Sequence, residues 1–481
     1  MKTYETVIGL EVHVELSTKT KIFCSCSTEF GGEPNTQCCP VCTGMPGTLP
    51  VLNKQAVEYA IAAGLALHCE ITRYCKFDRK NYFYPDLPKA YQISQLYLPI
   101  CRNGYVTIRS KNGKKTIGIH EIHMEEDAGK LIHADAGDCT WIDFNRCGVP
   151  LIEIVSKPDM RSTEEVIAYL EELKRTFQYL GISDCKMQEG SFRVDINLSV
   201  REAGAKELGV RTEMKNLNSF KAIARAIESE SKRQISLLEN GVQIIQETRR
   251  WDDSKEISIA MRSKEDVRDY RYFPEPDIPP LCIHEEWISE IRNRQPELAN
   301  EKVERYQKQF GIPAYDAAIL TSDKYLAEIF EDTVALCGKP KEVSNWIMVE
   351  VMRLLKEYEM EAAQIRFTPM QLANLIAMLD SGKINRPVAK EVFEQIFKEN
   401  VDPEEYVALH GLGMVSDDSV LRSVIEKIIH DNKQSVSDYR SGKAKAFGFL
   451  VGQTMKEMKG KADPTKVNKI LKELLDQKEY T

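Results

Sequence analysis

The sequence predicts an α+β protein whose N-terminal part is rich in strands and whose C-terminal part is helical. Strand-like alternation of apolar and polar residues recurs before residue 290, helical spacing of apolar residues dominates from about Glu290 to about Asn400, and a short all-helical tail follows. Four prolines within seven residues mark the expected boundary just beyond the strand-rich part: Pro274, Pro276, Pro279 and Pro280.

Length and composition describe a large globular protein. A chain of 481 residues, with 42% hydrophobic and 29% charged residues, is long enough for roughly three domains. It contains no run of about 18 apolar residues, and its first residues lack the apolar stretch of a secretory signal. We therefore expect no membrane span, no membrane partner and a cytoplasmic location.

Charge is distributed unevenly along the chain. Residues 432–481 carry eleven Lys and Arg against six Asp and Glu, a net of +5, and with −8 overall the first 431 residues carry −13. An acidic body with a basic tail favours a polyanionic partner at the tail. A lysine-rich helix face exposed to water explains the same charge at least as well.

The first expected strand is Val7–Leu16, VIGLEVHVEL. Alternation with a period of two places its apolar residues on one face and its ionisable residues on the other. The ionisable face consists of Glu11, His13 and Glu15. A sheet that collects carboxylates and imidazoles from several such strands is a platform for metal and phosphate, although one water-exposed face of an antiparallel sheet gives the same pattern.

The segment 24–42 holds five of the thirteen cysteines. Cys24 and Cys26 form one close pair, and Cys39 and Cys42 form a second pair after a twelve-residue gap. In a cytoplasmic chain this spacing predicts a closed, four-thiolate zinc site rather than disulfides. Cys38 is an alternative ligand to Cys39, and reduced cysteines in a metal-free loop are the competing interpretation.

A helix and then a loop are expected next. Residues 51–67 place Val57, Ile61 and Leu65 four apart on one helical face, which indicates core packing. Residues 77–95, FDRKNYFYPDLPKAYQISQ, are rich in aromatic and cationic residues and contain two prolines, so we predict a long loop. Such a loop suits base stacking and phosphate contacts, or packs on itself.

The stretch His120–Lys130, HEIHMEEDAGK, combines two imidazoles with three consecutive acidic residues. These side chains are suited to binding a hard divalent cation or to acid and base chemistry. A solvated strand or loop is the simplest explanation for such a charge run taken alone. The similar polar face of Val7–Leu16 is the observation that favours a site.

Two further elements follow the same logic. Arg161–Gly181 predicts a helix, since Ser162 and Glu165 form a capping box and Gly181 is a stop signal. Val194–Val200, VDINLSV, predicts a strand that carries Asp195, Asn197 and Ser199 on its polar face.

Residues 210–217, VRTEMKNL, place Arg211, Glu213 and Lys215 on one face of a short strand. These residues supply cations for phosphate charge, or they form a cross-strand ion pair on a wet surface. Ser219 then opens a long helix that ends at about Asn240. The chain contains no GxxxxGK[ST] phosphate loop, no GxGxxG segment, no kinase motif set and no amidase-type nucleophile segment.

Taken together, the motifs are similar to those of a known family, the B subunits of bacterial aspartyl/glutamyl-tRNA amidotransferases. The resemblance runs over essentially the whole chain and rests on long phrases in matching order: VIGLEVHVEL, the CxC and CPVC pairs, FDRKNYFYPDLPKAYQISQ, HMEEDAGK, PLIEIVSKPDMRS, TEMKNLNSF, DYRYFPEPDIPP and GKAKAFGFLVGQTMK.

The resemblance implies a fold, a reaction and partners. It implies an antiparallel-sheet cradle domain over residues 1–293 with the zinc insert at 24–42, a helical domain over 294–405 and a tRNA-binding tail domain over 406–481. It implies a heterotrimer in which an A subunit releases ammonia from glutamine, a C subunit wraps both chains, and the B subunit phosphorylates Glu-tRNA(Gln) or Asp-tRNA(Asn) with ATP before amidation. This activity is that of a carbon–nitrogen ligase in protein biosynthesis.

The resemblance also assigns residues. Glu11, His13, Glu126, Glu153 and Asp195 fall at metal or catalytic positions, with Mg²⁺ as the expected ion and Glu11, His13 and Glu126 as catalytic residues. Glu126 requires a bulge or loop, because alternation points it away from His123 and Glu125. A non-catalytic tRNA-binding scaffold and a self-sufficient glutamine-dependent enzyme are the rival functions, and the missing amidase segment argues against the second.

Overall fold

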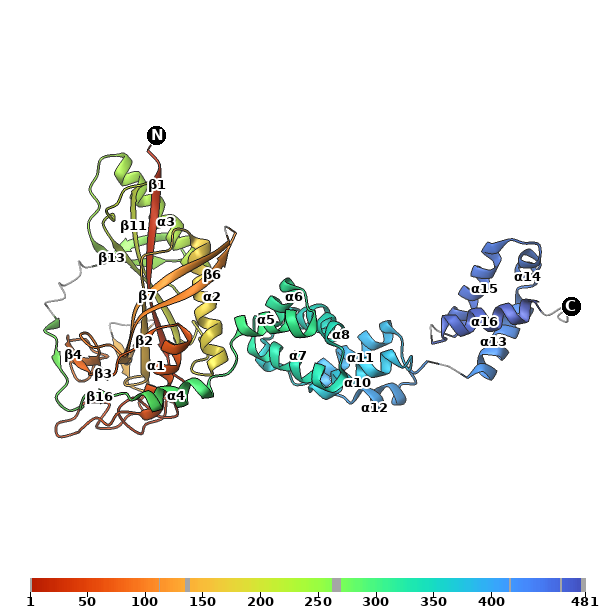
Figure 1. The fold of residues 1–481 in the computed structure, drawn as a ribbon, viewed down its shortest axis with the longest axis horizontal. Coiled ribbons are helices and arrows are strands. Elements are labelled where there is room, and N and C mark those ends of the chain that lie inside the picture. The colour runs from red at the N-terminus through yellow and green to blue at the C-terminus, as the bar shows by residue number, and fades with distance from the viewer. Residues whose placement is uncertain are drawn as a thin grey trace. The chain divides into compact units, whose positions relative to one another are not determined.

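The computed structural model describes residues 2–111, 113–134, 139–261, 270–414, 417–458 and 461–476. The chain divides into two compact units, Met1–Leu298 and Ala299–Thr481. The first unit mixes strands and helices and the second is helical, which confirms the predicted α+β class (Figure 1). The finer division at residues 293 and 405 stays a prediction; residue 293 lies in α4 (Glu285–Arg294) and residue 405 in α12 (Pro403–Leu409).

A mostly antiparallel sheet of nine strands organises the first unit, with the order β14-β13-β12-β11-β1-β10-β7-β6-β2. Only β12 and β13 run parallel to each other. The strands of this sheet are β1 (Tyr4–Glu15), β2 (Glu70–Ile71), β6 (Cys101–Ser110), β7 (Gly113–Glu126), β10 (Pro150–Ser156), β11 (Phe192–Glu202), β12 (Thr212–Lys215), β13 (Glu247–Asp252) and β14 (Ile257–Ala260).

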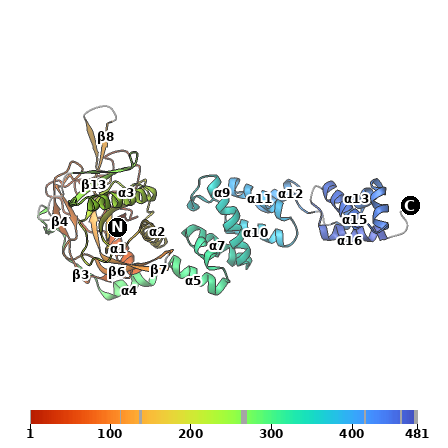
Figure 2. The same ribbon diagram turned by 90° about the horizontal axis from the view of Figure 1, so that it is seen from above.

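Three small sheets contain the other described strands of this unit. They are β15-β4-β5, β16-β3 and the hairpin β8-β9, which projects from the unit in Figure 2. Their bounds are β3 (Tyr74–Cys75), β4 (Asp78–Asn81), β5 (Tyr91–Ser94), β8 (Lys130–His133), β9 (Thr140–Asp143), β15 (Phe273–Pro274) and β16 (Leu281–Cys282).

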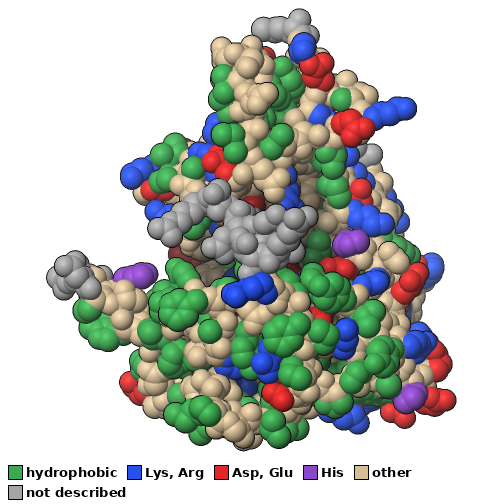
Figure 3. Space-filling view, turned by 90° about the vertical axis from the view of Figure 1, so that its left-hand side faces the viewer, with side chains coloured by type: hydrophobic (Ala, Val, Ile, Leu, Met, Phe, Trp, Pro, Cys, Tyr) green, Lys and Arg blue, Asp and Glu red, His purple; other side chains and the backbone are tan. Residues whose placement is uncertain are grey.

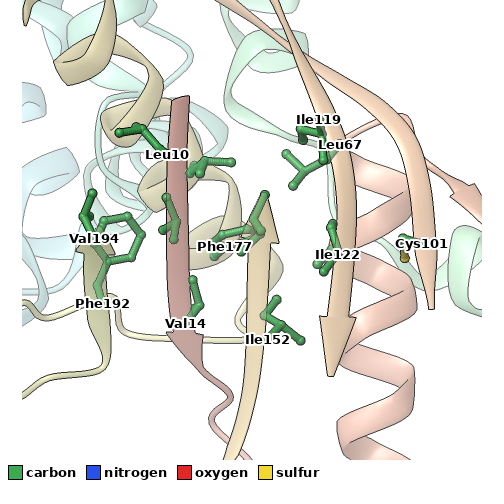
Figure 4. Packing of buried hydrophobic residues seen from close by; sticks show 14 of the residues in the cluster. Leu10, Val14, Leu67, Cys101, Ile119, Ile122, Ile152, Phe177, Phe192 and Val194 are labelled. Carbon is green, nitrogen blue, oxygen red and sulfur yellow. The ribbon is translucent and has the colours of Figure 1, made fainter. Parts of the chain in front are cut away.

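Helices cover one face of the large sheet. These are α1 (Lys54–Ala66), α2 (Thr163–Leu180) and α3 (Phe220–Glu239), and α4 packs on α1. The apolar faces of β1, β7, β10 and β11 meet the helices in one core, where Phe177 of α2 lies beside the side chains of Leu10, Val14 and Ile152 (Figure 4). The period-two pattern produces this arrangement, since it gives each strand one apolar face for the helices and one polar face for the opposite side.

The predicted strands and helices of the first unit are present, with boundaries shifted by a few residues. Ser162 caps α2 by accepting from the Glu165 amide, and Gly181 ends it with a left-handed φ of +69°. Ser219 caps α3 in the same way. These caps satisfy amide groups that a helix end otherwise leaves without a partner.

The prediction of one long loop over residues 77–95 is wrong. Residues 78–81 and 91–94 pair as the antiparallel strands β4 and β5, with Asp78 opposite Ser94 and Asn81 opposite Tyr91. Both prolines that suggested a loop, Pro85 and Pro88, lie in the connection between the strands and do not interrupt the pairing. Proline density therefore located the turn and not the whole segment.

The second unit contains no strand among its described residues. It holds two clusters of buried apolar residues, one from α5 to α12 and the other from α13 to α16. Its helices are α5 (Ala299–Phe310), α6 (Ala314–Leu320), α7 (Lys324–Cys337), α8 (Pro340–Asn345), the π-helix η2 (Trp346–Val351), α9 (Met352–Glu357), the short 3₁₀ helix η3 (Ala362–Gln364), α10 (Pro369–Asp380), α11 (Arg386–Glu399), α12, α13 (Asp418–Asp431), α14 (Lys433–Arg440), α15 (Ala444–Glu457) and α16 (Pro464–Asp476). Among the described residues, none of the helices has the length and apolar character needed to cross a membrane.

Candidate active site and metal centres

Strand register places ionisable side chains side by side on the polar face of the large sheet. Across β1 and β11, Glu11 lies opposite Asp195 and His13 opposite Arg193. On the other side of β1, His13 lies opposite Glu153 of β10. Glu153 in turn lies opposite His123 of β7. Because paired positions point to the same face, four separate strands bring these side chains together.

The first cluster consists of His13, Glu125 and Glu153. One ligand atom of each lies within 4.8 Å of the others. The His13 Nε2 atom is 3.5 Å from Glu125 Oε1 and 3.4 Å from Glu153 Oε2. His123 adds a contact of 2.8 Å between its Nε2 atom and Glu153 Oε2. Two carboxylates and one imidazole are a donor set that fits a divalent cation, although the nitrogen suits transition metals better than Mg²⁺.

Burial and mutual charge set the ionisation of this cluster. Burial by itself lowers the pKa of His13, but the Glu153 and Glu125 carboxylates outweigh it and raise the pKa to about 9. Burial, with the neighbouring Glu153 charge, raises the pKa of Glu125. Burial also acts to raise the pKa of Glu153, but the two histidines reverse this and hold it well below its usual value. The two buried histidines and the Glu153 carboxylate thus hold one another in their charged forms.

The second cluster consists of Glu11, Asp195 and Glu213, whose nearest carboxylate oxygens also lie within 4.8 Å of one another. Asn197 donates to Glu11 Oε1 at 2.9 Å and Thr248 donates to Glu213 Oε2 at 2.7 Å, so both carboxylates are held in place. Lys215 Nζ contacts Asp195 at 2.5 Å and Glu213 at 3.3 Å. An all-oxygen donor set of this kind fits Mg²⁺.

Both clusters line one cavity of about 700 Å³. Its floor is the polar face of the sheet, and cationic side chains surround the carboxylates. The lining residues that carry charge or aromatic rings are Glu11, His13, Lys80, Tyr82, Glu125, Asp127, Glu153, Arg193, Asp195, Arg211, Glu213, Lys215, Tyr270 and Tyr272. The cavity volume lies within the range typical of small-molecule binding sites.

Glu126 does not join either cluster. Strand β7 keeps its regular alternation through this position, pairing Glu126 with Pro150 without the bulge that its predicted role requires. Its side chain points to the opposite face, where Glu126 Oε1 accepts from Lys89 Nζ at 2.5 Å and from the Ile93 amide at 2.9 Å. The carboxylate that the strand delivers to the cavity is that of Glu125.

A network of Glu15, Asp127, Arg146 and Arg193 borders the first cluster. Arg193 donates to Asp127 at 2.6 Å, and Arg146 Nε lies 3.6 Å from the same carboxylate. One oxygen of Glu15 is buried without a hydrogen-bond partner among the described residues. Burial and then the adjacent Asp127 charge raise the pKa of Glu15 to about 9, so this carboxyl is protonated at neutral pH.

The raised pKa of the buried Glu15 carboxyl predicts that the stability of the protein depends on pH. Because its native pKa lies above the unfolded value of 4.5, the native state keeps a proton that the unfolded chain loses between pH 4.5 and about 9, and stability falls as pH rises through this window. We expect Glu15→Gln to stabilise the protein on the order of 1–3 kcal/mol at pH 8 and to have little effect at pH 5. Scanning calorimetry at the two pH values measures this.

The exposed residue Glu207 supplies the matched control, since Glu207→Gln makes the same chemical change without burial. Equal effects of Glu15→Gln at pH 5 and pH 8 would contradict a protonated Glu15.

The segment 24–42 brings Cys24, Cys26, Cys39 and Cys42 together, with their Sγ atoms within 4.8 Å of one another. Four soft thiolates in this arrangement fit zinc. Cys38 is outside the group and its thiol donates to the Asn35 carbonyl at 3.3 Å. Lys21 is fully buried beside the group, with its Nζ atom 3.6 Å from Cys42 Sγ. A buried ammonium there compensates thiolate charge.

Several residues of the cavity were missing from the set of predicted site residues. Glu125, which lines the cavity, and His123, which contacts Glu153 beside it, share the alternation of β7, so the sequence pattern did contain their signal. Arg193 lies one residue before the predicted strand, and a longer strand would have placed it beside Asp195. Tyr270 and Tyr272 had no such signal, because they come from an irregular segment far along the chain.

The cavity floor holds two acidic clusters flanked by lysine and arginine, a set of side chains of the class suited to binding a divalent cation together with an anionic substrate. The chain matches the family model described as the GatB/GatE catalytic domain over residues 6–289 and the GatB domain over residues 328–475. It therefore belongs to the GatB family, the B subunits of tRNA-dependent amidotransferases, which are carbon–nitrogen ligases.

Similar curated proteins share this description along their whole length. The B subunit of the aspartyl/glutamyl-tRNA(Asn/Gln) amidotransferase of Lachnoclostridium phytofermentans is 70% identical over 477 residues, covering 99% of this chain and 100% of the relative. The protein of the same name from Agathobacter rectalis is 66% identical over 475 residues, covering 99% and 100%. That from Caldicellulosiruptor saccharolyticus is 58% identical over 477 residues, covering 98% and 99%.

Proposed function

We propose that this chain uses ATP to phosphorylate the side-chain carboxylate of Glu-tRNA(Gln), Asp-tRNA(Asn) or both, and then completes amidation with ammonia. A carboxylate oxygen attacks the γ-phosphorus and ADP leaves; the nitrogen of ammonia then attacks the acyl carbon and inorganic phosphate leaves. Two acidic clusters on one sheet face, inside a cavity that also carries cationic side chains, are the observation that supports this reaction.

The residues divide the work between them. Glu11, Asp195 and Glu213 are suited to holding the Mg²⁺ of ATP, and Arg211 and Lys215 lie beside them to bind phosphate oxygens. The cluster of His13, Glu125 and Glu153 is suited to a second cation next to the reacting carboxylate. Bound Mg²⁺ supplies neutralisation of phosphate charge and alignment of the oxygens.

One of the three catalytic residues that the resemblance implied is replaced by its neighbour in this proposal. Glu11 and His13 keep the roles that the resemblance implied, as ligands on the cavity floor. Glu125 takes the role expected for Glu126, because only Glu125 points into the cavity. Glu126 is assigned to the buried pair with Lys89, where each charge compensates the other.

The proposal includes partners and a location. Ammonia comes from an A subunit that hydrolyses glutamine, and a C subunit completes a heterotrimer in the cytoplasm. The basic tail, residues 432–481, supports contact with tRNA because its net charge of +5 attracts phosphates. The helical domain, which the sequence places at 294–405, also contributes to this contact.

The decisive experiment measures ADP release by this chain assembled with its A and C subunits, with and without misacylated Glu-tRNA(Gln), in the absence of glutamine and ammonia. ADP that forms only with the charged tRNA supports phosphorylation at this site. No release by a complex that still binds the tRNA would leave a scaffold and contradict the proposal.

Zinc in the four-cysteine group gives a separate prediction. We expect about one zinc per chain in protein purified without chelator. Lys21→Met removes the buried ammonium beside Cys42, so we expect zinc to leave this variant faster in the presence of a chelating dye. Lys19→Met, at an exposed lysine two residues earlier, is the control. Clearly less than one zinc per wild-type chain would contradict a zinc site.

A further inference from the structure

Three tyrosines form one wall of the active-site cavity, a wall that the proposed function leaves without a role. Tyr82 follows strand β4, while Tyr270 and Tyr272 come from a segment far along the chain, and all three line the cavity that contains the acidic clusters. The ring centroids of Tyr82 and Tyr270 are 6.0 Å apart, as are those of Tyr270 and Tyr272. We call this group, Tyr82, Tyr270 and Tyr272, the tyrosine wall.

The rings of the tyrosine wall meet edge to face. The interplanar angles are 78° between Tyr82 and Tyr270 and 69° between Tyr270 and Tyr272. In an edge-to-face contact the edge of one ring lies against the face of the other, so each contact occupies at most one face of a ring. All three side chains are only partly buried, so ring surface remains open to the cavity.

The backbone is strained where it presents two of the rings. Arg271, between Tyr270 and Tyr272, has a φ of +46°, a left-handed conformation that an arginine rarely adopts. The Asn81 amide holds this turn by donating to the carbonyl of Arg271 at 2.9 Å and to that of Tyr270 at 3.3 Å. Asn81 directly precedes Tyr82, so its side chain ties the backbone before Tyr82 to the backbone that carries Tyr270 and Tyr272. A strained conformation of this kind persists only where the surrounding structure holds it, and such conformations cluster at functional sites.

Charge beside the wall adds a second recognition element. Lys80 Nζ lies 4.8 Å from the Tyr270 centroid and 5.9 Å from the Tyr82 centroid, and Lys80 also lines the cavity. Partly exposed aromatic rings with a lysine against them match a nucleotide, whose base stacks on a ring face that remains free while its phosphate approaches the ammonium. Figure 3 views the molecule from the side of β4 and shows hydrophobic side chains interleaved with lysine and arginine on its lower half.

We propose that the tyrosine wall binds an adenine ring by stacking. This inference rests on the proposed function, in which two substrates carry adenosine: ATP and the 3′-terminal nucleotide of the tRNA. Strand β4, which Tyr82 follows, pairs with β5, and Ser94 of β5 reaches the first cluster with its Oγ atom 3.5 Å from Glu125 Oε2, whereas Lys215 contacts the second cluster. This placement favours the terminal adenosine, which is joined to the amino acid that reacts.

Steady-state ADP release by the assembled complex tests the wall, with ATP and misacylated Glu-tRNA(Gln) varied in turn. We expect Tyr82→Ala and Tyr270→Ala to raise one KM by about ten- to a hundred-fold, while Tyr82→Phe and Tyr270→Phe, which keep the ring, stay close to wild type. A higher KM for the tRNA identifies the terminal adenosine, and a higher KM for ATP identifies the nucleotide substrate.

The control is Phe83→Ala, which removes an aromatic ring next to Tyr82 that is 84% exposed and does not line the cavity. Unchanged KM values in both alanine variants, or a loss of kcat alone, would overturn the proposal. A wild-type complex without tRNA-dependent ADP release would instead contradict the proposed function, so the two failures are distinct.

If an alanine variant does not fold, photocrosslinking of the wild-type complex tests whether the tyrosine wall binds adenine. ATP with an 8-azidoadenine base, and tRNA with 8-azidoadenosine at its 3′ end, are irradiated separately, and the modified peptides are identified by mass spectrometry. Modification at residues 80–82 or 270–272 by either probe supports the wall. Modification by both probes only at other residues would refute it.

Asn81 is a positioning residue in this scheme. We expect Asn81→Ala to raise the same KM as the tyrosine variants, because the left-handed turn at Arg271 loses its support. Adding Arg271→Gly is expected to restore part of that loss, since glycine adopts a positive φ at no steric cost. A purely structural role for Asn81 would move the thermal midpoint and kcat without this rescue of KM.

Discussion

A complex carrying Glu125→Gln is expected to release ADP about 10²–10³-fold more slowly than the wild type, and to need more Mg²⁺ for the activity that remains. Glu125 is 4% exposed and contributes to the first cluster together with His13 and Glu153. Glutamine has the same size but presents a neutral amide, so the cluster loses one of its two negative charges. ADP release as a function of Mg²⁺ concentration measures both effects.

The matched control is Glu126→Gln, the same substitution one residue later on the opposite face of β7. Lys89 and the Ile93 amide still find an oxygen acceptor in that variant, although the charge opposite Lys89 is lost. We expect its Mg²⁺ dependence to match the wild type, whatever the stability cost. A shifted Mg²⁺ dependence in Glu126→Gln, with none in Glu125→Gln, would restore the role that the sequence resemblance gave to Glu126.

Asp195→Asn is expected to cause a loss of similar size, about 10²-fold or more, through the second cluster. Asp195 lies opposite Glu11 across two paired strands and contacts Lys215 at 2.5 Å, so the substitution removes a carboxylate from the cluster and a partner from the lysine. We expect the Mg²⁺ concentration needed for half-maximal activity and the KM for ATP both to rise. Both are measured from ADP release at saturating charged tRNA.

Lys215→Met separates the contribution of the lysine to ATP binding from that of the carboxylates to Mg²⁺ binding. It removes the cation beside the proposed phosphate position but leaves all three carboxylates. The KM for ATP should therefore rise, while the Mg²⁺ concentration needed for activity stays the same or falls. An Asp195→Asn complex with normal Mg²⁺ and ATP dependence would remove the second cluster from the mechanism.

The sequence predicted only part of the candidate active site. Alternation correctly put Glu11 and His13 on one face, and Asp195 on the polar face of its own strand. Which carboxylates share a cavity depends on strand order and register, and these bring Glu153 opposite both His13 and His123. No local pattern encodes that pairing, because it is decided by contacts between strands that lie far apart in the chain.

Local sequence patterns also did not predict how the aromatic segments come together. Composition marked residues 77–95 as suited to contacts with a base, but placed them in a loop. The structure pairs β4 with β5 and with β15, and the pairing of Phe273 with Arg79 brings the segment of Tyr270 and Tyr272 beside Tyr82. A tyrosine wall assembled from two distant segments cannot be read from either of them.

The sequence by itself determined the α+β class, the main strands and helices with their caps, the two cysteine pairs and the acidic faces, because period, cap chemistry and ligand spacing are local properties. The tertiary structure alone decided that Glu125 rather than Glu126 reaches the cavity, that Lys21 lies buried against the cysteines, and that Asn81 holds a strained turn from far along the chain. These features follow from sheet order and register, which arise only when the strands pack into one core.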